Sequence, residues 1–168
     1  MGNEDHSPRV PRGLFVFSTT LPFIRFQRMI AVILSRVLKN NMAKIMIVDD
    51  DVQASGLLER VVKMYDHQTV IVNRSSLAME TAKSFHPDLF ILDLMMPEIN
   101  GFELCALLRA DPNYATTPVI VVSAMEDKES KIKAHSIGAN EYITKPYNIV
   151  DLGERLGTLL SQNKNNPN

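Results

Sequence analysis

The segment LFILDLMMPEINGFEL, residues 89–104, contains the pattern that decides the fold. Its first four residues form a continuous apolar run, which is typical of a strand buried on both faces of a sheet. The run ends at a single carboxylate, Asp93, and a Pro and an Asn-Gly pair follow. Residues 101–110 then carry apolar side chains at helical spacing. The segment therefore predicts a buried strand, a loop with one acid at its start, and a helix.

The same alternation extends on both sides of this segment. Five apolar runs predict strands, at residues 44–48, 69–72, 89–92, 119–122 and 141–144. Four stretches with apolar residues at helical spacing predict helices, at residues 52–65, 76–86, 101–110 and 148–161, and the polar stretch 127–137, which ends before Gly138, predicts a fifth. Because the strands are continuous apolar runs, we expect an α/β domain in which helices cover both faces of a parallel sheet.

The composition fits an ordinary globular protein. The chain has 168 residues, of which 45% are hydrophobic and 22% charged, so it can bury the core of one domain and carry an appendage. Its single cysteine, Cys105, excludes an internal disulfide and fits a reducing compartment, and we expect a cytoplasmic protein. The histidines are scattered along the sequence, and none has the spacing of a zinc site.

Charge is unevenly distributed along the chain. Residues 1–40 carry six basic and two acidic side chains, a net charge of +4, whereas residues 41–168 carry twelve basic and seventeen acidic ones, a net charge of −5. This change indicates a boundary near Asn40. Nonspecific binding of nucleic acid needs basic groups that face the phosphates. The acidic part is therefore a poor candidate for direct contact with nucleic acid.

Residues 21–40, LPFIRFQRMIAVILSRVLKN, form a basic amphipathic pattern. Acidic residues precede the apolar run and no small-residue cleavage site follows it, which argues against a signal peptide. Three arginines interrupt the run, whereas a membrane span needs about 20 apolar residues. Such a helix could lie on an anionic membrane surface. Because Met42 is an available initiator, we instead interpret residues 1–41 as an over-long gene prediction or a dispensable extension.

Polar side chains follow the predicted strands at the points where the strands end. In strand order, these residues are Asp49–Asp51, Asn73–Arg74, Asp93, Ser123 and Lys145. Taken singly, each has a structural explanation as a helix cap, a turn residue or a solvated loop residue. Ligands of parallel sheets bind outside the carboxyl ends of the strands. Four of the five strand ends therefore deliver acids, a hydroxyl and an amine to the same edge. Unrelated caps would have no reason to meet at one edge.

Carboxylates, a lysine and a hydroxyl at one edge suit the binding of a phosphoryl group. Neighbouring carboxylates repel, and a Mg²⁺ ion, which takes one or two carboxylates and keeps several waters, would screen them. The lysine adds a positive charge and the hydroxyl a hydrogen bond. The sequence has no glycine-rich nucleotide loop, so the phosphoryl group need not belong to a nucleotide. Since an aspartate can form an aspartyl phosphate as a nucleophile, Asp93 is the candidate for phosphorylation.

Four motifs, IMIVDDD, LFILDLMMPEINGFEL, VIVVSA and EYITKP, resemble those of bacterial two-component receiver domains in sequence, order and spacing. On this resemblance we expect a receiver domain over residues 42–161 and a disordered tail over residues 162–168. The resemblance implies a doubly wound, flavodoxin-like α/β fold with five parallel strands in the order 2-1-3-4-5.

The resemblance also implies a role for several of these residues. Asp93 would be the phosphoacceptor. Asp49 and Asp50 would hold Mg²⁺ together with Asp93 and the main-chain carbonyl of Met95. A magnesium ion is therefore the expected cofactor.

Three residues on or just after the fourth and fifth predicted strands complete the implied site. Lys145 would bind the phosphoryl group, and its peptide bond to Pro146 would be cis. Ser123 would be the switch hydroxyl that moves to bond the phosphoryl group, and Tyr142 the switch aromatic residue that then swings inward. This movement would reshape the face formed by the fourth helix, the fifth strand and the fifth helix, where a downstream protein target would dock.

A receiver would accept its phosphoryl group from a sensor histidine kinase or a histidine phosphotransfer protein, and it would act by docking and not as an enzyme. The sequence ends soon after the last predicted helix, which resembles stand-alone receivers, either chemotaxis regulators or relay intermediates. One alternative is an aspartate-nucleophile phosphatase, since Asp49 and Asp51 form a D-x-D pattern. The other is a pseudo-receiver that binds partners without phosphorylation. The presence of every key residue type argues against this second alternative.

Two methionines bear on how long a phosphorylated state would last. Met95 lies two residues past Asp93, and Met125 lies two residues past Ser123. In the implied fold both would flank the water that hydrolyses an aspartyl phosphate. A thioether is a weak acceptor and never a donor, so it cannot orient that water. The pair therefore predicts a long-lived phosphorylated state.

Overall fold

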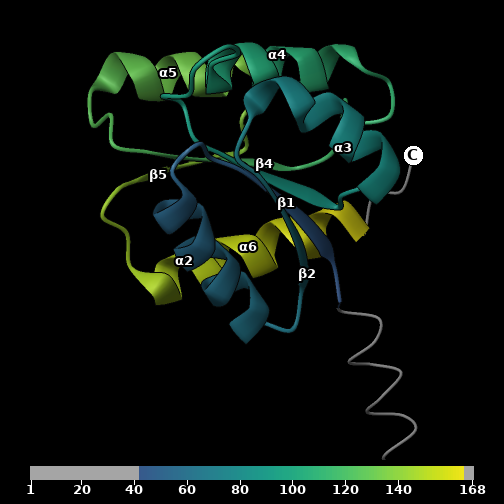
Figure 1. Cartoon of the computed structure of the whole chain (residues 1–168). Helices are drawn as coiled ribbons and strands as arrows, with labels where there is room; N and C mark the ends of the chain where they lie inside the picture. The colour runs from purple at the N-terminus through teal and green to yellow at the C-terminus, as the bar shows by residue number, and fades with distance from the viewer. Residues whose placement is uncertain (1–41, 165–168) are drawn as a thin grey trace, which may run out of the picture. The chain divides into compact units, whose positions relative to one another are not determined.

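The computed structural model describes residues 42–164 as a parallel sheet between two layers of helices (Figure 1). The strands are β1 (Lys44–Val48), β2 (Gln68–Val72), β3 (Leu89–Leu92), β4 (Val119–Ser123) and β5 (Glu141–Thr144). The helices are α2 (Val52–Met64), α3 (Ala78–Phe85), α4 (Gly101–Ala110), α5 (Lys128–Ile137) and α6 (Ile149–Lys164), with a 3₁₀ turn, η1 (Ser75–Leu77), before α3. All neighbouring strands are parallel, in the order β2-β1-β3-β4-β5, which confirms the predicted fold.

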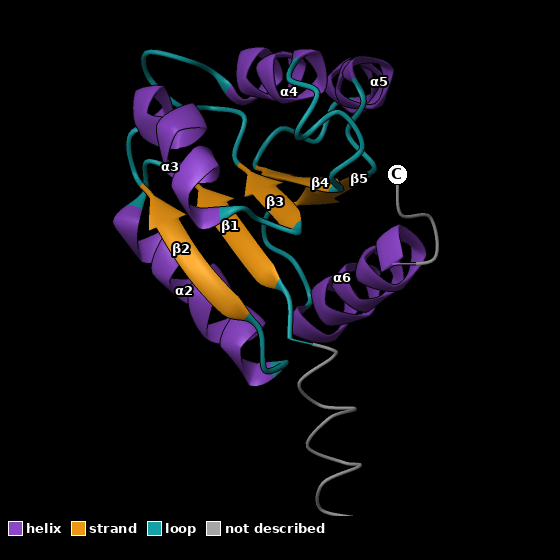
Figure 2. Cartoon of the chain, turned by 90° about the vertical axis from the view of Figure 1, so that its right-hand side faces the viewer, coloured by secondary structure: helices purple, strands orange, loops and turns teal. Residues whose placement is uncertain are grey.

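The two faces of the sheet are covered by different helices. Helices α3, α4 and α5 lie on one face, and α2 and α6 lie on the other (Figures 1 and 2). Side chains of β3 alternate between the layers: Phe90 and Leu92 pack in the core under α3, α4 and α5, whereas Leu89 and Ile91 pack in the core over α2 and α6. A strand buried on both faces must be apolar throughout, which explains the continuous run LFIL.

Polar residues fix the ends of the helices near the sheet. The Asp51 side chain accepts hydrogen bonds from the main-chain N–H groups of Gln53 and Ala54 and caps α2. Asn100 and Glu103 form a reciprocal capping box at the start of α4. Helix α5 ends at Gly138, whose φ of 108° is left-handed and suits a residue without a Cβ atom. These caps explain why the helices begin and end where the sequence pattern predicts.

Two boundaries differ by more than one residue from those that the pattern predicts. Helix α3 begins at Ala78, because the preceding residues form η1, where a single helix over 76–86 was expected. Helix α6 continues to Lys164, so residues 162–164 are helical and do not belong to a disordered tail. Among residues 42–164, no helix is long and apolar enough to cross a membrane. The expectations for residues 1–41 and 165–168 lie outside the described residues.

Candidate functional site

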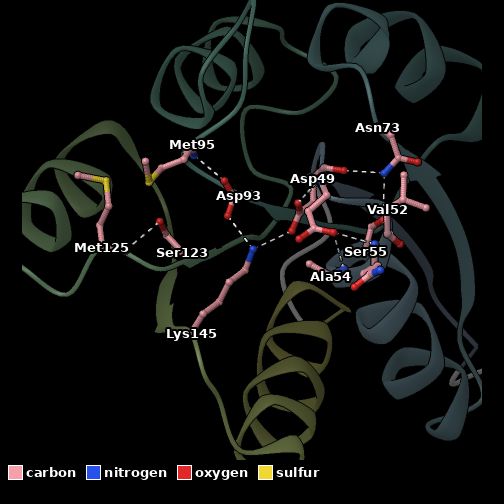
Figure 3. A network of polar contacts seen from close by, with 12 residues as sticks. Asp49, Val52, Ala54, Ser55, Asn73, Asp93, Met95, Ser123, Met125 and Lys145 are labelled. Carbon is pink, nitrogen blue, oxygen red and sulfur yellow. Dashed lines mark hydrogen bonds and ion pairs between the residues drawn. The ribbon is translucent and has the colours of Figure 1, made fainter.

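Lys145 joins the ends of two other strands through its ammonium group. Its Nζ lies 2.8 Å from Oδ2 of Asp49, which follows β1, and 2.8 Å from Oδ1 of Asp93, which follows β3 (Figure 3). The carboxylates are almost fully buried, with 2% and 8% of their side-chain surfaces exposed, whereas Lys145 is 24% exposed. The sheet thus brings together one cation and two anions that are distant in sequence, as the strand-end pattern predicts.

Burial and charge act in opposite directions on the ionisable groups of this cluster. Burial raises the pKa of Asp49 above its usual value, and the Lys145 ammonium only partly offsets this effect. Burial by itself would lower the pKa of Lys145, but hydrogen bonds to Asp49 and Asp93 and their negative charges raise it. Charge outweighs burial at Lys145, because the ammonium faces two carboxylates. Burial outweighs charge at Asp49, which faces one ammonium and also the like charge of Asp93. The charged form of Lys145 is therefore favoured, whereas burial disfavours the charged form of Asp49.

The Asp93 carboxylate is held by main-chain groups as well as by Lys145. Its Oδ2 accepts a hydrogen bond from the main-chain N–H of Met95, and its own N–H donates to the carbonyl of Val48 at 2.9 Å. Gly101, at the start of α4, packs against the same backbone: its N–H donates to the Leu94 carbonyl at 3.1 Å. A Cβ atom on Gly101 would collide with the Asp93 carbonyl oxygen. The Asn-Gly pair thus lets α4 begin directly against the site.

The three consecutive aspartates have different environments. Asp49 is buried, and its Oδ1 accepts the main-chain N–H of Asp51 at 2.9 Å. Asp51 is exposed, and its own carboxylate caps the start of α2. Asp50 lies between them and is exposed at the rim of the sheet. The cap therefore belongs to Asp51, which leaves Asp49 and Asp50 as the acids available for a ligand.

Ser123 and Tyr142 meet at the backbone of Met125. Ser123 is fully buried at the end of β4, and its Oγ accepts the main-chain N–H of Met125 at 3.3 Å. The Tyr142 hydroxyl donates to the Met125 carbonyl at 2.8 Å. Burial raises the pKa of Tyr142 more than the nearby Ser123 hydroxyl lowers it, so the phenol remains a neutral donor. A movement of Ser123 would therefore change the surroundings of Tyr142, because both side chains bond the backbone of Met125.

The acidic residues fit a small hard cation that keeps part of its water. Among residues 42–164, no three histidine, cysteine or acidic side chains are grouped closely enough to hold a metal ion by themselves. Mg²⁺ does not need such a cage, since it usually binds through one or two carboxylates and retains several waters. Asp49 and Asp93 supply two buried carboxylates that share a single lysine, and Asp50 is exposed beside them. The donor set thus suits Mg²⁺ and is poor for a fully enclosed metal.

Asn73 has a place in this site that the sequence pattern did not assign. It directly follows β2, and its amide nitrogen donates to the main-chain oxygen of Asp49 at 2.6 Å and to Oγ of Ser55 at 2.9 Å. Its position at a strand end was the available signal. A strand-end asparagine is more often a turn residue, however, and only the fold shows which carbonyl it contacts.

The Lys145–Pro146 peptide bond is cis, as the resemblance implies.

Residues 45–157 match the response regulator receiver domain family, and the chain belongs to that family. Its members are phosphorylation-activated regulators of two-component systems. Among curated relatives, the chain is 36% identical over 121 residues to the DNA-binding dual master transcriptional regulator RpaA of Synechocystis sp., covering 71% of this chain and 49% of RpaA. The chain thus spans about half the length of this relative.

Solved receiver domains show the same fold. The receiver domain of a signal transduction histidine kinase from Syntrophus aciditrophicus is 32% identical, with a TM-score of 0.67 and coverage of 71% of this chain and 91% of that one. The BeF3-activated N-terminal receiver domain of Klebsiella pneumoniae RstA is 29% identical, with a TM-score of 0.66 and coverage of 70% and 97%. Because RpaA is named a DNA-binding regulator, these comparisons do not support the expectation of no contact with nucleic acid.

Proposed function

We propose that Asp93 accepts a phosphoryl group from a phosphohistidine on a sensor histidine kinase or a histidine phosphotransfer protein. The observation that carries this proposal is the buried Asp93 carboxylate, held 2.8 Å from the Lys145 ammonium and bonded to the Met95 N–H. A carboxylate oxygen attacks phosphorus, the phosphorus–nitrogen bond breaks, and the imidazole leaves with the bonding electrons. Lys145 compensates the charge that gathers on the phosphoryl oxygens.

Mg²⁺ is the cofactor that this chemistry calls for. Asp49, Asp50, Asp93 and the main-chain carbonyl of Met95 would hold it. When bound, it supplies positive charge next to the phosphoryl oxygens and screens the acids from one another. The raised pKa of Asp49, which burial causes, supports this assignment, because a buried anion with too little compensating charge is relieved by a bound cation.

The phosphorylated state is read by a protein partner in this proposal. A phosphoryl group adds negative charge and acceptor oxygens. Ser123 moves to donate to it, which releases the Met125 N–H and changes the surroundings of Tyr142. The face formed by α5, β5 and α6 is reshaped, and a downstream target that prefers the new shape shifts the population toward it. Both the phosphohistidine donor and this target would be met in the cytoplasm.

Phosphotransfer from a phosphorylated histidine phosphotransfer domain tests this function. The parent protein is expected to take up one phosphoryl group per chain and then stop, as a receiver does. Asp93→Asn should leave the donor phosphorylated. Repeated release of inorganic phosphate from a phosphomonoester would instead favour the aspartate-nucleophile phosphatase. A folded chain that takes no phosphoryl group from any donor would favour the pseudo-receiver.

A further inference from the structure

Asn73 connects three parts of the chain with a single side chain. Its amide nitrogen has two hydrogens, and each has an acceptor: the main-chain oxygen of Asp49 at 2.6 Å and Oγ of Ser55 at 2.9 Å (Figure 3). Asp49 follows β1, Ser55 lies in α2, and Asn73 itself follows β2. The amide therefore fixes the end of β1 against both its neighbouring strand and the next helix.

Ser55 is a rigid anchor for this amide. Its side chain is fully buried, and its hydroxyl donates to the Val52 carbonyl at 3.2 Å inside the first turn of α2. The hydroxyl oxygen is then free to accept from Asn73. Because a buried polar group that loses its partner costs about 1–3 kcal/mol, Asn73 is strongly held in this orientation.

The acidic segment between β1 and α2 is fixed by these contacts. The Asp49 N–H donates to the Val72 carbonyl at 3.3 Å, and the Asp51 N–H donates to Oδ1 of Asp49 at 2.9 Å. The oxygen that Asn73 binds belongs to the peptide group joining Asp49 to Asp50. The tilt of that peptide plane sets the direction in which both acidic side chains leave the backbone. Three adjacent carboxylates repel each other, so the segment would otherwise turn away from the geometry that a cation needs.

We propose that Asn73 is a positioning residue for the divalent cation at the carboxyl edge of the sheet. It does not touch the cation. It fixes the Asp49–Asp50 peptide before the cation arrives, so that little ordering remains to be done on binding. Partners that orient metal ligands typically contribute about 10- to 100-fold in metal affinity. This inference rests on the proposed function, since it assigns a residue to the same magnesium site.

Isothermal titration calorimetry of Mg²⁺ binding to the parent and to Asn73→Leu tests the inference directly. Leucine keeps the approximate volume of asparagine and removes both donors. We expect a loss of about tenfold in Mg²⁺ affinity. Ser55→Ala should lose less, because the bond from Asn73 to the Asp49 carbonyl remains. Asn113→Leu is the matched control: its amide also donates to an aspartate, Asp111, at 2.9 Å, and its Mg²⁺ affinity should equal that of the parent.

Labelling with acetyl phosphate separates a positioning role from general loosening of the fold. In Asn73→Leu, the Mg²⁺ concentration for half-maximal labelling should rise about tenfold while the rate at saturating Mg²⁺ stays near that of the parent. Equal Mg²⁺ affinity in Asn73→Leu and the parent would overturn the inference and leave the proposed function intact. An equal or larger loss in Ser55→Ala, together with a lower melting temperature, would also overturn it. A parent protein that neither binds Mg²⁺ nor becomes labelled would overturn both.

Discussion

The Lys145 ammonium lies 2.8 Å from Oδ1 of Asp93, although 52 residues separate them in the sequence. Lys145 follows β5 and Asp93 follows β3, and β4 lies between these two strands. The lysine side chain therefore reaches across a strand to meet the acid. Such a contact requires β3, β4 and β5 to be paired in this order, so the site depends on the topology of the sheet.

Removing the charge of Lys145 should slow phosphorylation of Asp93. A hydrogen bond to a charged group contributes about 1.5–3 kcal/mol, which corresponds to a loss of roughly 10- to 100-fold if it acts on the transition state. We expect this loss in Lys145→Met, measured as the rate of labelling by acetyl phosphate at saturating Mg²⁺. Lys63→Met is the control, because Lys63 pairs with Glu59 on the surface of α2. Equal rates in Lys145→Met and the parent would show that the lysine has no part in the transfer.

Asp49→Asn should stabilise the protein at neutral pH when a chelator removes metal. Burial raises the pKa of Asp49 in the folded protein. A carboxyl group of this kind contributes stability below its unfolded pKa of about 3.9 and loses it as pH rises through the folded pKa. The variant has no such loss. Its free energy of unfolding, relative to that of the parent, should therefore rise as the pH increases from about 3 to about 7. Urea unfolding across this range measures the difference.

A helix cap provides the opposite sign for comparison. The main-chain N–H of Ser130 lowers the pKa of Asp127, which caps α5. Its contribution is present above the unfolded pKa and is lost as pH falls. Asp127→Asn should therefore lose stability relative to the parent as pH rises over the same range. The interpretation of Asp49 would be wrong if Asp49→Asn behaved like Asp127→Asn.

Gly101→Ala should disturb both the fold and the site. The added Cβ atom would collide with the Asp93 carbonyl oxygen and lie 2.9 Å from the Cα of Leu94. These are backbone atoms that cannot rotate away, so α4 must shift, and overpacking of this kind costs about 1–3 kcal/mol. We expect a lower free energy of unfolding and slower labelling of Asp93.

Another helical glycine serves as the control for this substitution. Gly157 lies in α6, and a Cβ atom there would meet no atom of residues 42–164 within 4 Å. Gly157→Ala should raise stability by up to about 1 kcal/mol, because alanine is the better helix former. Chemical unfolding of the two variants should therefore give opposite signs. A gain in both would show that α4 is not in tight contact with the Asp93 backbone.

Met95 and Met125 should make the aspartyl phosphate long-lived. Met95 is 66% exposed beside Asp93, and the Met125 sulfur accepts a hydrogen bond from the Ser130 hydroxyl at 3.8 Å. Neither thioether can orient a hydrolytic water. Met125→Glu combined with Met95→Asn should shorten the half-life of the phosphorylated protein several-fold, measured by loss of label after removal of the donor. Met64→Glu, at an exposed methionine of α2, should decay like the parent. The same decay in the double variant would refute water positioning by these residues.

The strands and the convergence at their ends were predictable because buried parallel strands leave a strong signal. Each predicted strand lies within one residue of its observed bounds, and Asp49, Asp93 and Lys145 converge since parallel strands end at one edge. The contacts of Asn73 were not predictable from the sequence. They depend on a side-chain rotamer and on which carbonyl the neighbouring strand presents, and neither leaves a periodic pattern.

The mass of the intact protein after incubation with acetyl phosphate and Mg²⁺ tests phosphorylation of Asp93 most directly. We expect the parent to gain the mass of one phosphoryl group and Asp93→Asn to gain none, while Asp88→Asn, an exposed acid at the opposite end of β3, labels like the parent. Addition of excess chelator should abolish the gain. A phosphoryl adduct that persists in Asp93→Asn would contradict the assignment of Asp93 as the phosphoacceptor.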